Sequence, residues 1–470
     1  MALRKERMSP VDTAWWHMEE PTNLMMITSV MTFEKVITLD QLHQVIEQRM
    51  LRFDRFRQRV IEPRFGIGTL YWEPDPKFDI NAHIHHLALP EPGGKAALQD
   101  LVSDLMGTPL DYSKPLWQAY LIDSYEGGCA VIFRLHHCIA DGIALVRVML
   151  SMTDDSPDAE WWVKTEKKSR RKPGLLRRMT NPAISAAKTT RQVTEAVWDE
   201  YTTTLKNPGR LIDATKFGAN AAARLGKITL RWPDPQSLYK GPLGTQKRSA
   251  WSEAIRLSDV KAIGRVMGGT INDVMATAVS GALRRYLEAH NQPTKGIKLR
   301  AYTPVNLRPL DSPIELGNRF GLVYLTLPIG IEDQVERFQE VKRCMDELKD
   351  SPEAIVAMGL LSVGGLAPKE LQSSVFDFFH TKATAVMTNV PGPRQPIYMA
   401  GSRLKYIMAW VPQSGKLGMG ISVISYNGGI QVGFNTDSGL VPNPTQLVTF
   451  LMQEFEDMLA LVHTQELTEV

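Results

Sequence analysis

The sequence predicts a two-domain α/β protein, and three observations support this fold class. The chain has 470 residues, which at about 100–200 residues per domain suits two domains of similar size. Hydrophobic residues make up 43% of the chain and charged residues 22%, which are ordinary values for a globular protein. Segments with the apolar spacing of helices alternate with segments that have the spacing of strands. Two lobes with a cleft between them are therefore expected.

Residues 1–158 are expected to form the first domain, because the period of their apolar residues changes several times between that of a strand and that of a helix. The pattern ends at TDDSPDAEWW, which interrupts it in the manner of a loop. The expected elements are a strand at 24–33, helices at 39–49 and 95–106, strands at 117–123 and 130–135, and a helix from Ile143.

Residues 159–231 are expected to form a basic helical connector. Between residues 164 and 231 there are 16 Lys and Arg against 5 Asp and Glu, although the whole chain carries a net charge of only +3. Stretches rich in Ala and Thr, at 183–201 and 211–225, have helical spacing. No aromatic residues interleave with the basic ones and no groove-reading motif accompanies them, so nucleic acid is not an expected partner.

Residues 232–470 are expected to form the second domain, again with interleaved helices and strands. No internal repeat and no low-complexity tract interrupts it. The expected elements are strands at 249–255, 299–305, 321–327 and 385–390, helices at 258–267, 271–289 and 334–350, a hairpin of 418–426 and 429–434, and a final helix at 444–463.

Several kinds of site are not supported by the sequence. The cysteines Cys129, Cys138 and Cys344 form no CxxC pair and no cluster with histidine at metal spacing, so neither a disulfide framework nor a zinc site is expected. There is no Walker or Rossmann glycine loop. The N-terminus has no apolar stretch behind its basic residues, and the apolar runs fall short of the ~20 residues that cross a bilayer. A cytoplasmic protein is expected.

The segment HHCIADG carries the chemistry that the sequence predicts. It places His136 and His137 at the end of an apolar strand, and Asp141 and Gly142 at the start of an apolar helix. Neutral imidazole can act as a general base near pH 7, because the unperturbed pKa of histidine is about 6.5. Adjacent strand residues point to opposite faces, so only one histidine faces a reacting centre, and the spacing does not choose between them. The alternative is a pair of core or surface histidines at a strand end.

In this HHxxxDG segment the chain resembles the CoA-dependent acyltransferase superfamily, which includes chloramphenicol acetyltransferase, carnitine acyltransferases and peptide-synthetase condensation domains. Further segments resemble the bacterial wax ester synthase/diacylglycerol acyltransferase family more closely. They are MSPVDTAWW at 8–16, KPLW at 114–117, TINDVMATAVSGALRRYL at 270–287, PVNLRP at 304–309 and TNVPGP at 388–393. The resemblance spans most of the chain. It implies a chloramphenicol-acetyltransferase-like fold with a substrate tunnel between the domains.

The resemblance also implies a reaction. A long-chain acyl group would pass from acyl-CoA to a fatty alcohol, giving a wax ester, or to diacylglycerol, giving triacylglycerol. His137 would be the general base and His136 its support, both substrates would react in one ternary complex, and no cofactor or metal would be needed because acyl-CoA is a co-substrate. Two rival functions are a condensation or trans-acylation enzyme that takes its acyl group from a carrier protein, and a non-catalytic protein that binds lipid surfaces.

Lipid substrates imply that the protein meets a lipid surface. The basic connector is the expected contact with anionic headgroups of the inner membrane or of lipid inclusions, as a peripheral association. A solvated helical linker and a contact with CoA phosphates are the alternatives.

Asp141 is expected to be structural. It stands where a helix N-cap belongs, and in the resembled superfamily this aspartate turns away from the substrate and pairs with an arginine, for which Arg308 is a candidate. Gly142 would let substrate approach the backbone closely, or would be a plain turn glycine.

Asn272 and Asp273 stand at the start of an apolar helix behind Thr270, where helix capping is one interpretation. The resemblance implies the other, in which Asn272 reaches the reacting centre and helps to hold the substrate or a developing oxyanion, and Asp273 helps to bind substrate. Trp117 would line the floor of the cleft or would simply begin an apolar strand.

Cys138 follows His137 directly, but it occupies a variable position of the motif, so an acyl-cysteine intermediate is not expected. The other histidine cluster, His83, His85 and His86, lacks the Asp-Gly and precedes a Pro-rich turn. A solvated strand end is expected there rather than a metal site.

Overall fold

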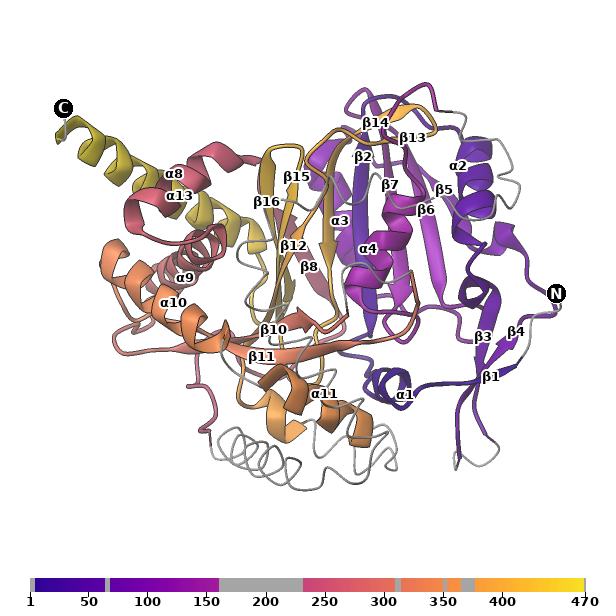
Figure 1. Cartoon of the computed structure of the whole chain (residues 1–470), viewed down its shortest axis with the longest axis horizontal. Coiled ribbons are helices and arrows are strands. Elements are labelled where there is room, and N and C mark those ends of the chain that lie inside the picture. The colour runs from indigo at the N-terminus through magenta and orange to yellow at the C-terminus, as the bar shows by residue number, and fades with distance from the viewer. Residues whose placement is uncertain are drawn as a thin grey trace, which may run out of the picture.

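A computed structural model describes residues 5–63, 68–159, 231–308, 314–349, 353–364 and 377–468 (Figure 1). The expected basic helical connector at residues 159–231 lies outside the described residues except at its two end positions. The described elements form two large sheets with helices packed on them, so the predicted mixed α/β class is confirmed.

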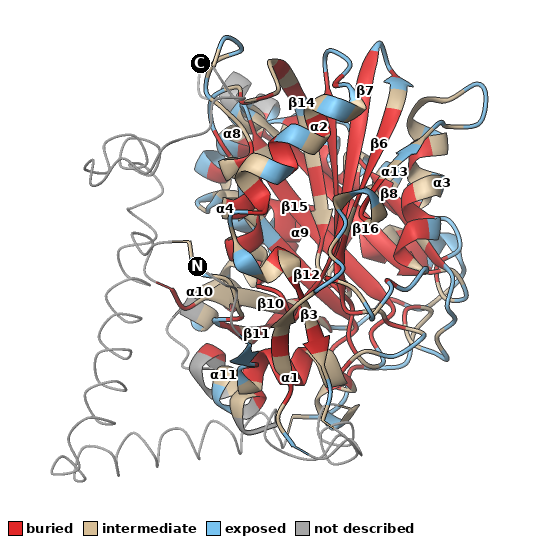
Figure 2. Ribbon diagram, turned by 90° about the vertical axis from the view of Figure 1, so that its right-hand side faces the viewer, coloured by how far each residue is buried: buried red, intermediate tan, exposed pale blue. Residues whose placement is uncertain are grey.

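Six strands form the first sheet, in the order β13 (Tyr398–Met399), β14 (Ser402–Trp410), β2 (Met26–Phe33), β7 (Gly128–His136), β6 (Trp117–Tyr125) and β5 (Ile84–Leu87). Helix α4 (Gly142–Ser151) packs against one face and helix α3 (Gly94–Met106) against the other. Strand β7 is buried at every residue, as Figure 2 shows for much of this sheet. Burial on both faces explains why the central strands read as nearly continuous apolar runs.

Seven strands form the second sheet, in the order β11 (Phe320–Leu327), β10 (Leu299–Asn306), β12 (Ala385–Pro391), β15 (Met419–Tyr426), β16 (Gly429–Asp437) and β8 (Lys247–Trp251), with β9 (Ile255–Arg256) pairing with β16. Its helices gather on the side away from the first sheet (Figure 1) and are α8 (Leu257–Met267), α9 (Ile271–Ala289), α10 (Gln334–Lys349) and α13 (Pro444–Thr468). Apolar side chains of α9 and α13 share one buried cluster with this sheet.

Smaller elements complete the described chain, and most of them were not among those expected. Residues 46–50 continue the expected helix at 39–49 as a π-helix, after α2 ends at Val45. A three-stranded sheet and two helices lie outside the expected pattern, and they are β1 (Glu6–Arg7), β4 (Tyr71–Pro74), β3 (Gln58–Ile61), α1 (Pro10–His17) and α11 (Glu353–Gly364). Helix α1 has only eight residues, and five consecutive ones, from Val11 to Trp15, are buried, so its apolar residues show little helical periodicity.

Strand β14 departs from the expected division of the chain, because it lies within residues 232–470 and yet pairs with β2. The pairing runs from Leu404 opposite Phe33 to Trp410 opposite Thr28. It covers an edge of β2 that would otherwise present unpaired backbone groups. The segment expected to form the second domain therefore contributes two strands, β13 and β14, to the first sheet.

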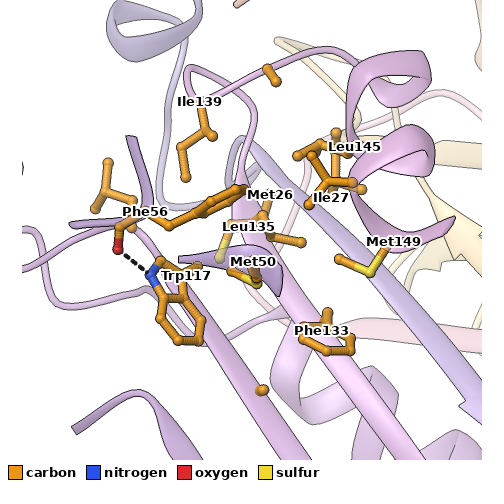
Figure 3. Close-up of a cluster of buried hydrophobic side chains, with 14 of the residues drawn as sticks. Met26, Ile27, Met50, Phe56, Trp117, Phe133, Leu135, Ile139, Leu145 and Met149 are labelled. Atoms are coloured by element: carbon orange, nitrogen blue, oxygen red, sulfur yellow. Dashed lines mark hydrogen bonds between the residues drawn. The ribbon is translucent and has the colours of Figure 1, made fainter. Parts of the chain in front are cut away.

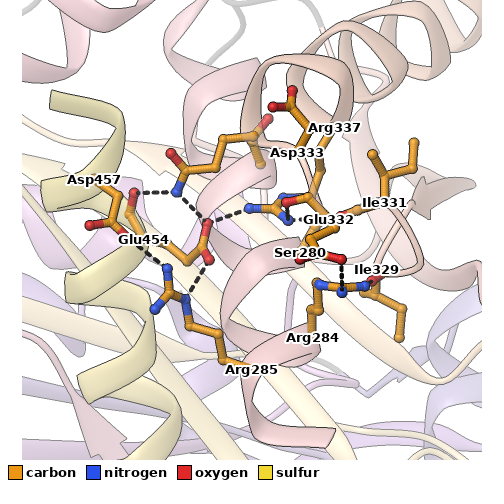
Figure 4. Close-up of polar contacts among 12 residues, drawn as sticks. Ser280, Arg284, Arg285, Ile329, Ile331, Glu332, Asp333, Arg337, Glu454 and Asp457 are labelled. Carbon is orange, nitrogen blue, oxygen red and sulfur yellow. Dashed lines mark hydrogen bonds and ion pairs between the residues drawn. The ribbon is translucent and has the colours of Figure 1, made fainter. Parts of the chain in front are cut away.

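A buried ion-pair network joins the helices of the second sheet (Figure 4). Glu454 on α13 is 2% exposed and accepts hydrogen bonds from Arg285 Nε on α9 at 2.5 Å and from Gln334 Nε2 on α10 at 2.9 Å. It also pairs with the buried guanidinium of Arg337 on α10. A buried carboxylate needs such charged partners, and here they fix three helices relative to one another.

Candidate active site

The two adjacent histidines point to different surroundings, as strand geometry predicts. His136 is the last residue of β7 and is completely buried. Its Nδ1 accepts the backbone N–H of Cys138 at 3.1 Å, so its hydrogen lies on Nε2, which donates to Glu19 Oε2 at 3.0 Å. The same carboxylate oxygen accepts the backbone N–H of Met25 at 2.9 Å. These bonds fix the ring of His136, which suits the predicted supporting role.

His137 lies between two aromatic rings. Its imidazole stacks on Trp15 with ring centroids 4.0 Å apart and lies 5.6 Å from the ring of Phe320. Nδ1 is buried and has no hydrogen-bond partner among the described residues. Burial, together with the neighbouring His136, lowers the pKa of His137 to about 3. The ring is therefore neutral at physiological pH, as a general base requires.

The backbone of His137 is held from both sides. Its N–H donates to the carbonyl of Met25 at 2.7 Å, and its carbonyl accepts Nδ2 of Asn318 at 2.8 Å. Asn318 is in turn held by the buried carboxylate of Asp12, which accepts both its Nδ2 and its backbone N–H. Asp12 and Trp15 both belong to MSPVDTAWW, so this segment positions the backbone and the ring of His137.

Asp141 caps α4 and pairs with Arg308, as predicted. One carboxylate oxygen accepts the backbone N–H of Ala144 at 2.9 Å. The other accepts Arg308 Nη1 at 2.6 Å and the backbone N–H of Arg319 at 2.9 Å. The side chains of Asp141 and Arg308 are 5% and 4% exposed, so this is a buried ion pair. Both oxygens of the Asp141 carboxylate therefore make hydrogen bonds that join α4 to the segment around Gly317. The backbone carbonyl of Gly317 accepts a hydrogen bond from Nη2 of Arg308.

An apolar pocket with an empty volume of about 850 Å³ opens beside this turn. Its walls come from β2, β7, α4, β14 and the end of β12, and Gly142 and Leu135 are among them. A Cβ added to Gly142 would meet only Val411 Cγ1, at the ordinary distance of 3.9 Å. Packing within the protein therefore does not require a glycine at this position, and the interpretation that it leaves room for substrate stays open.

Trp117 has the contacts of a core residue. Its ring is fully buried and stacks on His83 with centroids 4.5 Å apart. Its indole N–H donates to the carbonyl of Phe56 at 2.8 Å (Figure 3). Trp117 is not among the residues lining the apolar pocket. Substrate contact by Trp117 stays a prediction, and the described contacts favour the other interpretation, a buried strand start.

Asn272 and Asp273 do not contact His137 in the described structure. Asp273 and Thr270 form a capping box, in which the aspartate accepts the backbone N–H of Thr270 at 2.7 Å. Asn272 is exposed, and its side-chain oxygen accepts Nδ2 of Asn389 on β12 at 2.6 Å. The capping interpretation is thus confirmed for Asp273, and a role of Asn272 at the reacting centre stays a prediction.

Cys138 and His83 are buried, whereas His85 is half-buried and His86 is exposed. Burial raises the pKa of the Cys138 thiol well above its usual range, which disfavours a thiolate nucleophile. The expectation of a solvated strand end at the other histidine cluster is wrong for His83, which is 2% exposed because its ring lies between Phe78 and Trp117. His86 is exposed and pairs with Asp123, as expected for a strand end.

Four residues that complete the site were not predicted individually, and they are Asp12, Trp15, Glu19 and Asn318. The first two stand in MSPVDTAWW, so the resemblance pointed to their segment without assigning them roles. No local sequence pattern predicts a role for Glu19 or Asn318, because each contacts the HHxxxDG segment only after the chain has folded.

The lowered pKa of His137 predicts a pH dependence of stability. The unfolded chain binds a proton at this residue near pH 6.5, and the folded chain does not until about pH 3. Folding stability is therefore fully present above pH 6.5 and is lost as the pH falls below it. Between pH 7.5 and 5.0 the free energy of unfolding should fall by about 2 kcal/mol more in the parent than in His137→Gln. Urea unfolding at both pH values measures this difference, and equal falls would contradict a buried neutral His137.

Comparison with protein families supports the resemblance seen in the sequence. The model described as the wax ester synthase/diacylglycerol acyltransferase catalytic domain matches residues 8–275, which is more than half of the chain. The model described as the C-terminal domain of the same family matches residues 316–459.

Individual relatives span nearly the whole chain. The O-acyltransferase WSD of Acinetobacter baylyi is 27% identical over 475 residues, covering 97% of this chain and 98% of the relative. A probable diacylglycerol O-acyltransferase of Mycobacterium tuberculosis is 25% identical over 431 residues, covering 90% of this chain and 88% of the relative.

Solved structures share the fold. The wax ester synthase/diacylglycerol acyltransferase from Marinobacter aquaeolei VT8 matches with a TM-score of 0.68 at 21% identity, covering 97% of this chain and 99% of the other. The first condensation domain of the CDA synthetase matches with a TM-score of 0.60 at 14% identity, covering 98% and 96%. At these identities the likeness shows the fold alone. The family models and the described geometry together show that this chain belongs to the wax ester synthase/diacylglycerol acyltransferase family and is an acyltransferase enzyme.

Proposed function

We propose that His137 is the general base in the transfer of a long-chain acyl group from acyl-CoA to the hydroxyl of a fatty alcohol or a diacylglycerol. The observation that carries this role is the environment of the His137 ring. The ring is neutral, it is stacked on Trp15 and tilted against Phe320, and its backbone is held by hydrogen bonds. A rigid and desolvated base keeps the orientation that proton transfer requires.

The reaction needs one proton acceptor and no covalent intermediate. Nε2 of His137 takes the hydroxyl proton while the alcohol oxygen attacks the thioester carbonyl carbon. The tetrahedral intermediate collapses by breaking the bond between carbon and sulfur, which leaves the ester and a thiolate. The imidazolium of His137 then returns the proton to the thiolate and releases CoA, so that all atoms and charges balance without a metal or cofactor.

The other residues around the turn have supporting parts in this proposal. His136 and Glu19 hold the end of β7, and Asp141 with Arg308 holds the start of α4. Neither carboxylate has a described hydrogen bond to His137, so the site does not work as a Ser-His-Asp type relay. The apolar pocket between α4 and the first sheet suits an alkyl chain, because long acyl chains and fatty alcohols need apolar walls.

We also propose a peripheral association with a lipid surface, since both acceptors dissolve in membranes or oil inclusions. No described helix is both long and apolar enough to cross a bilayer. The sequence between residues 164 and 231 carries 16 basic residues, and Trp232, which follows it, is 84% exposed. Basic residues beside an exposed tryptophan are typical of contacts with anionic headgroups.

Vesicle flotation tests this association. The protein should float with vesicles that contain phosphatidylglycerol and much less with pure phosphatidylcholine, and the difference should shrink at high salt because screening weakens charge attraction. Equal flotation with both kinds of vesicle would contradict an electrostatic attachment.

The activity test uses palmitoyl-CoA with either hexadecanol or dipalmitoylglycerol, and follows free CoA and extracted ester. Ester from either acceptor supports the proposal, and the ratio of the two products names the preferred acceptor. No ester with free acyl-CoA, but ester with an acyl carrier protein as donor, would establish the first rival function. Vesicle binding without ester from any donor would establish the second.

A further inference from the structure

A positive charge forms on His137 during the proposed reaction, and the described residues offer it no carboxylate partner. The ring becomes an imidazolium when Nε2 takes the hydroxyl proton. The carboxylates of the surrounding segments are bonded elsewhere, Glu19 to His136, Asp141 to Arg308 and Asp12 to Asn318. No described hydrogen bond joins a carboxylate to the ring of His137. Another group must therefore stabilise the charged ring.

The burial of His137 makes this charge costly. The residue is 3% exposed, so water does not solvate an imidazolium there. Burial is the main cause that lowers the pKa of His137, and the neighbouring His136 adds to it. The backbone carbonyl of His137 and the side chain of Asn318 act in the opposite direction, but both are uncharged dipoles. Any further group that attracts a cation would lower the barrier to proton transfer.

The indole of Trp15 has the geometry to attract this cation. Its ring centroid lies 4.0 Å from that of the His137 imidazole, and the two planes are inclined by only 23°. A cation within about 6 Å of an aromatic ring face is attracted by the ring quadrupole, and tryptophan gives the strongest attraction. The ring of Phe320 is less suitable, because it lies 5.6 Å from His137 at an angle of 54°. The face of Trp15 is therefore the better placed of the two aromatic contacts.

The packing of Trp15 does not by itself explain a tryptophan at this position. The residue is 5% exposed, and its indole N–H is buried without an acceptor among the described residues. A buried indole N–H ordinarily has a hydrogen-bond partner, and leaving it unpaired costs free energy. An apolar side chain would fill the space without an unpaired donor. The face of the indole, rather than its N–H, is thus the feature that the site uses.

Hydrogen bonds hold the two stacked rings in place relative to each other. Ser9 caps the helix of Trp15 by accepting the backbone N–H of Asp12 at 3.1 Å. The carboxylate of Asp12 accepts Nδ2 of Asn318 at 2.8 Å, and the same Nδ2 donates to the carbonyl of His137 at 2.8 Å. The helix that carries the indole and the backbone that carries the imidazole are therefore joined through Asn318. This link keeps the rings stacked while the charge forms and disappears.

We propose that the indole face of Trp15 stabilises the imidazolium form of His137 while the hydroxyl proton is on Nε2. Trp15 is then a positioning residue that acts through His137 and not on the substrate. The inference rests on the proposed function, since it requires His137 to be the general base. The attraction arises only when the imidazole is charged, so it is stronger in the transition state than in the ground state and raises the rate.

Replacing Trp15 with mono-, di- and trifluorotryptophan tests this role, because each fluorine withdraws charge from the ring face with little change of shape. The single-turnover rate of ester formation from palmitoyl-CoA and the better acceptor should fall at each step, by about 5-fold to 30-fold in total. The same series at Trp72 is the matched control. Its ring is fully buried and lies 4.1 Å from the permanent cation of Arg55, so fluorination there should leave the rate unchanged.

Repeating the series in His137→Gln shows whether Trp15 acts through the imidazole. Fluorination should leave the residual rate of this variant unchanged, because glutamine takes up no proton. Equal falls with histidine and with glutamine at position 137 would overturn the inference, since Trp15 would then act on the substrate or on packing. If His137→Gln loses the rate but fluorination of the parent has no effect, the inference fails and the proposed function stands. Parent-like rates in His137→Gln would overturn the proposed function, and this inference with it.

Discussion

Replacing His137 with alanine is expected to lower the rate of ester formation by about 10²–10⁴-fold, which is the usual contribution of a positioned general base. The alcohol would then lose its proton only to water, although both substrates could still bind. Steady-state assays with palmitoyl-CoA and the better acceptor measure this effect, and it should appear in kcat rather than in KM.

His86→Ala is the matched control for this variant, because His86 is an exposed histidine of the same domain whose Nε2 contacts Asp123. It should retain the parent rate. His137→Gln serves as a second variant, since it fills more of the space between Trp15 and Phe320 than alanine does. Parent-like rates in both His137 variants would remove His137 from the mechanism, whatever their folding.

Replacing Asp141 with asparagine is expected to lower the free energy of unfolding by about 3–5 kcal/mol, because it leaves the guanidinium of Arg308 buried without a counter-charge. Asparagine is as good a helix N-cap as aspartate, so the substitution isolates the loss of the ion pair from the loss of the cap. Urea unfolding, followed by circular dichroism, measures the change.

Two control variants test whether the loss of stability comes from the unpaired buried charge. Glu34→Gln breaks the exposed pair with Arg403 and should change the free energy of unfolding by no more than about 1 kcal/mol. Adding Arg308→Met to Asp141→Asn removes the unpaired buried charge and should recover part of the lost stability. If Asp141→Asn is no more harmful than Glu34→Gln, the buried pair does not hold the HHxxxDG turn.

Within the motif, His137 is expected to carry out the chemistry and Asp141 to stabilise the turn. His137 faces aromatic rings and keeps a neutral nitrogen for proton transfer. Asp141 faces Arg308 and the cap of α4, so it shapes the turn without polarising the histidine. A loss of activity in Asp141→Asn should therefore follow its loss of stability, and conditions that restore folding should restore the rate.

The sequence by itself determined the parts of this protein that depend on neighbouring residues. The HHxxxDG segment between an apolar strand and an apolar helix located the turn, and the position of Asp141 predicted its cap, because N-caps depend on local chemistry. The pairing of Asp141 with Arg308 came from the family resemblance and is present in the structure. The helix at 271–289 was predicted with the bounds that the structure gives it, since its apolar residues keep one period.

Only the tertiary structure decided which distant residues meet at the site. Glu19 reaches His136 across 117 positions of the chain, and Asn318 reaches the carbonyl of His137 across 181. Strand β14 joins β2 from the far end of the sequence and lines the apolar pocket. Such contacts leave no periodic signal, because they depend on how whole sheets and helices pack against one another. The local chemistry of the motif could thus be predicted from its residues, whereas its surroundings could be seen only once the chain was folded.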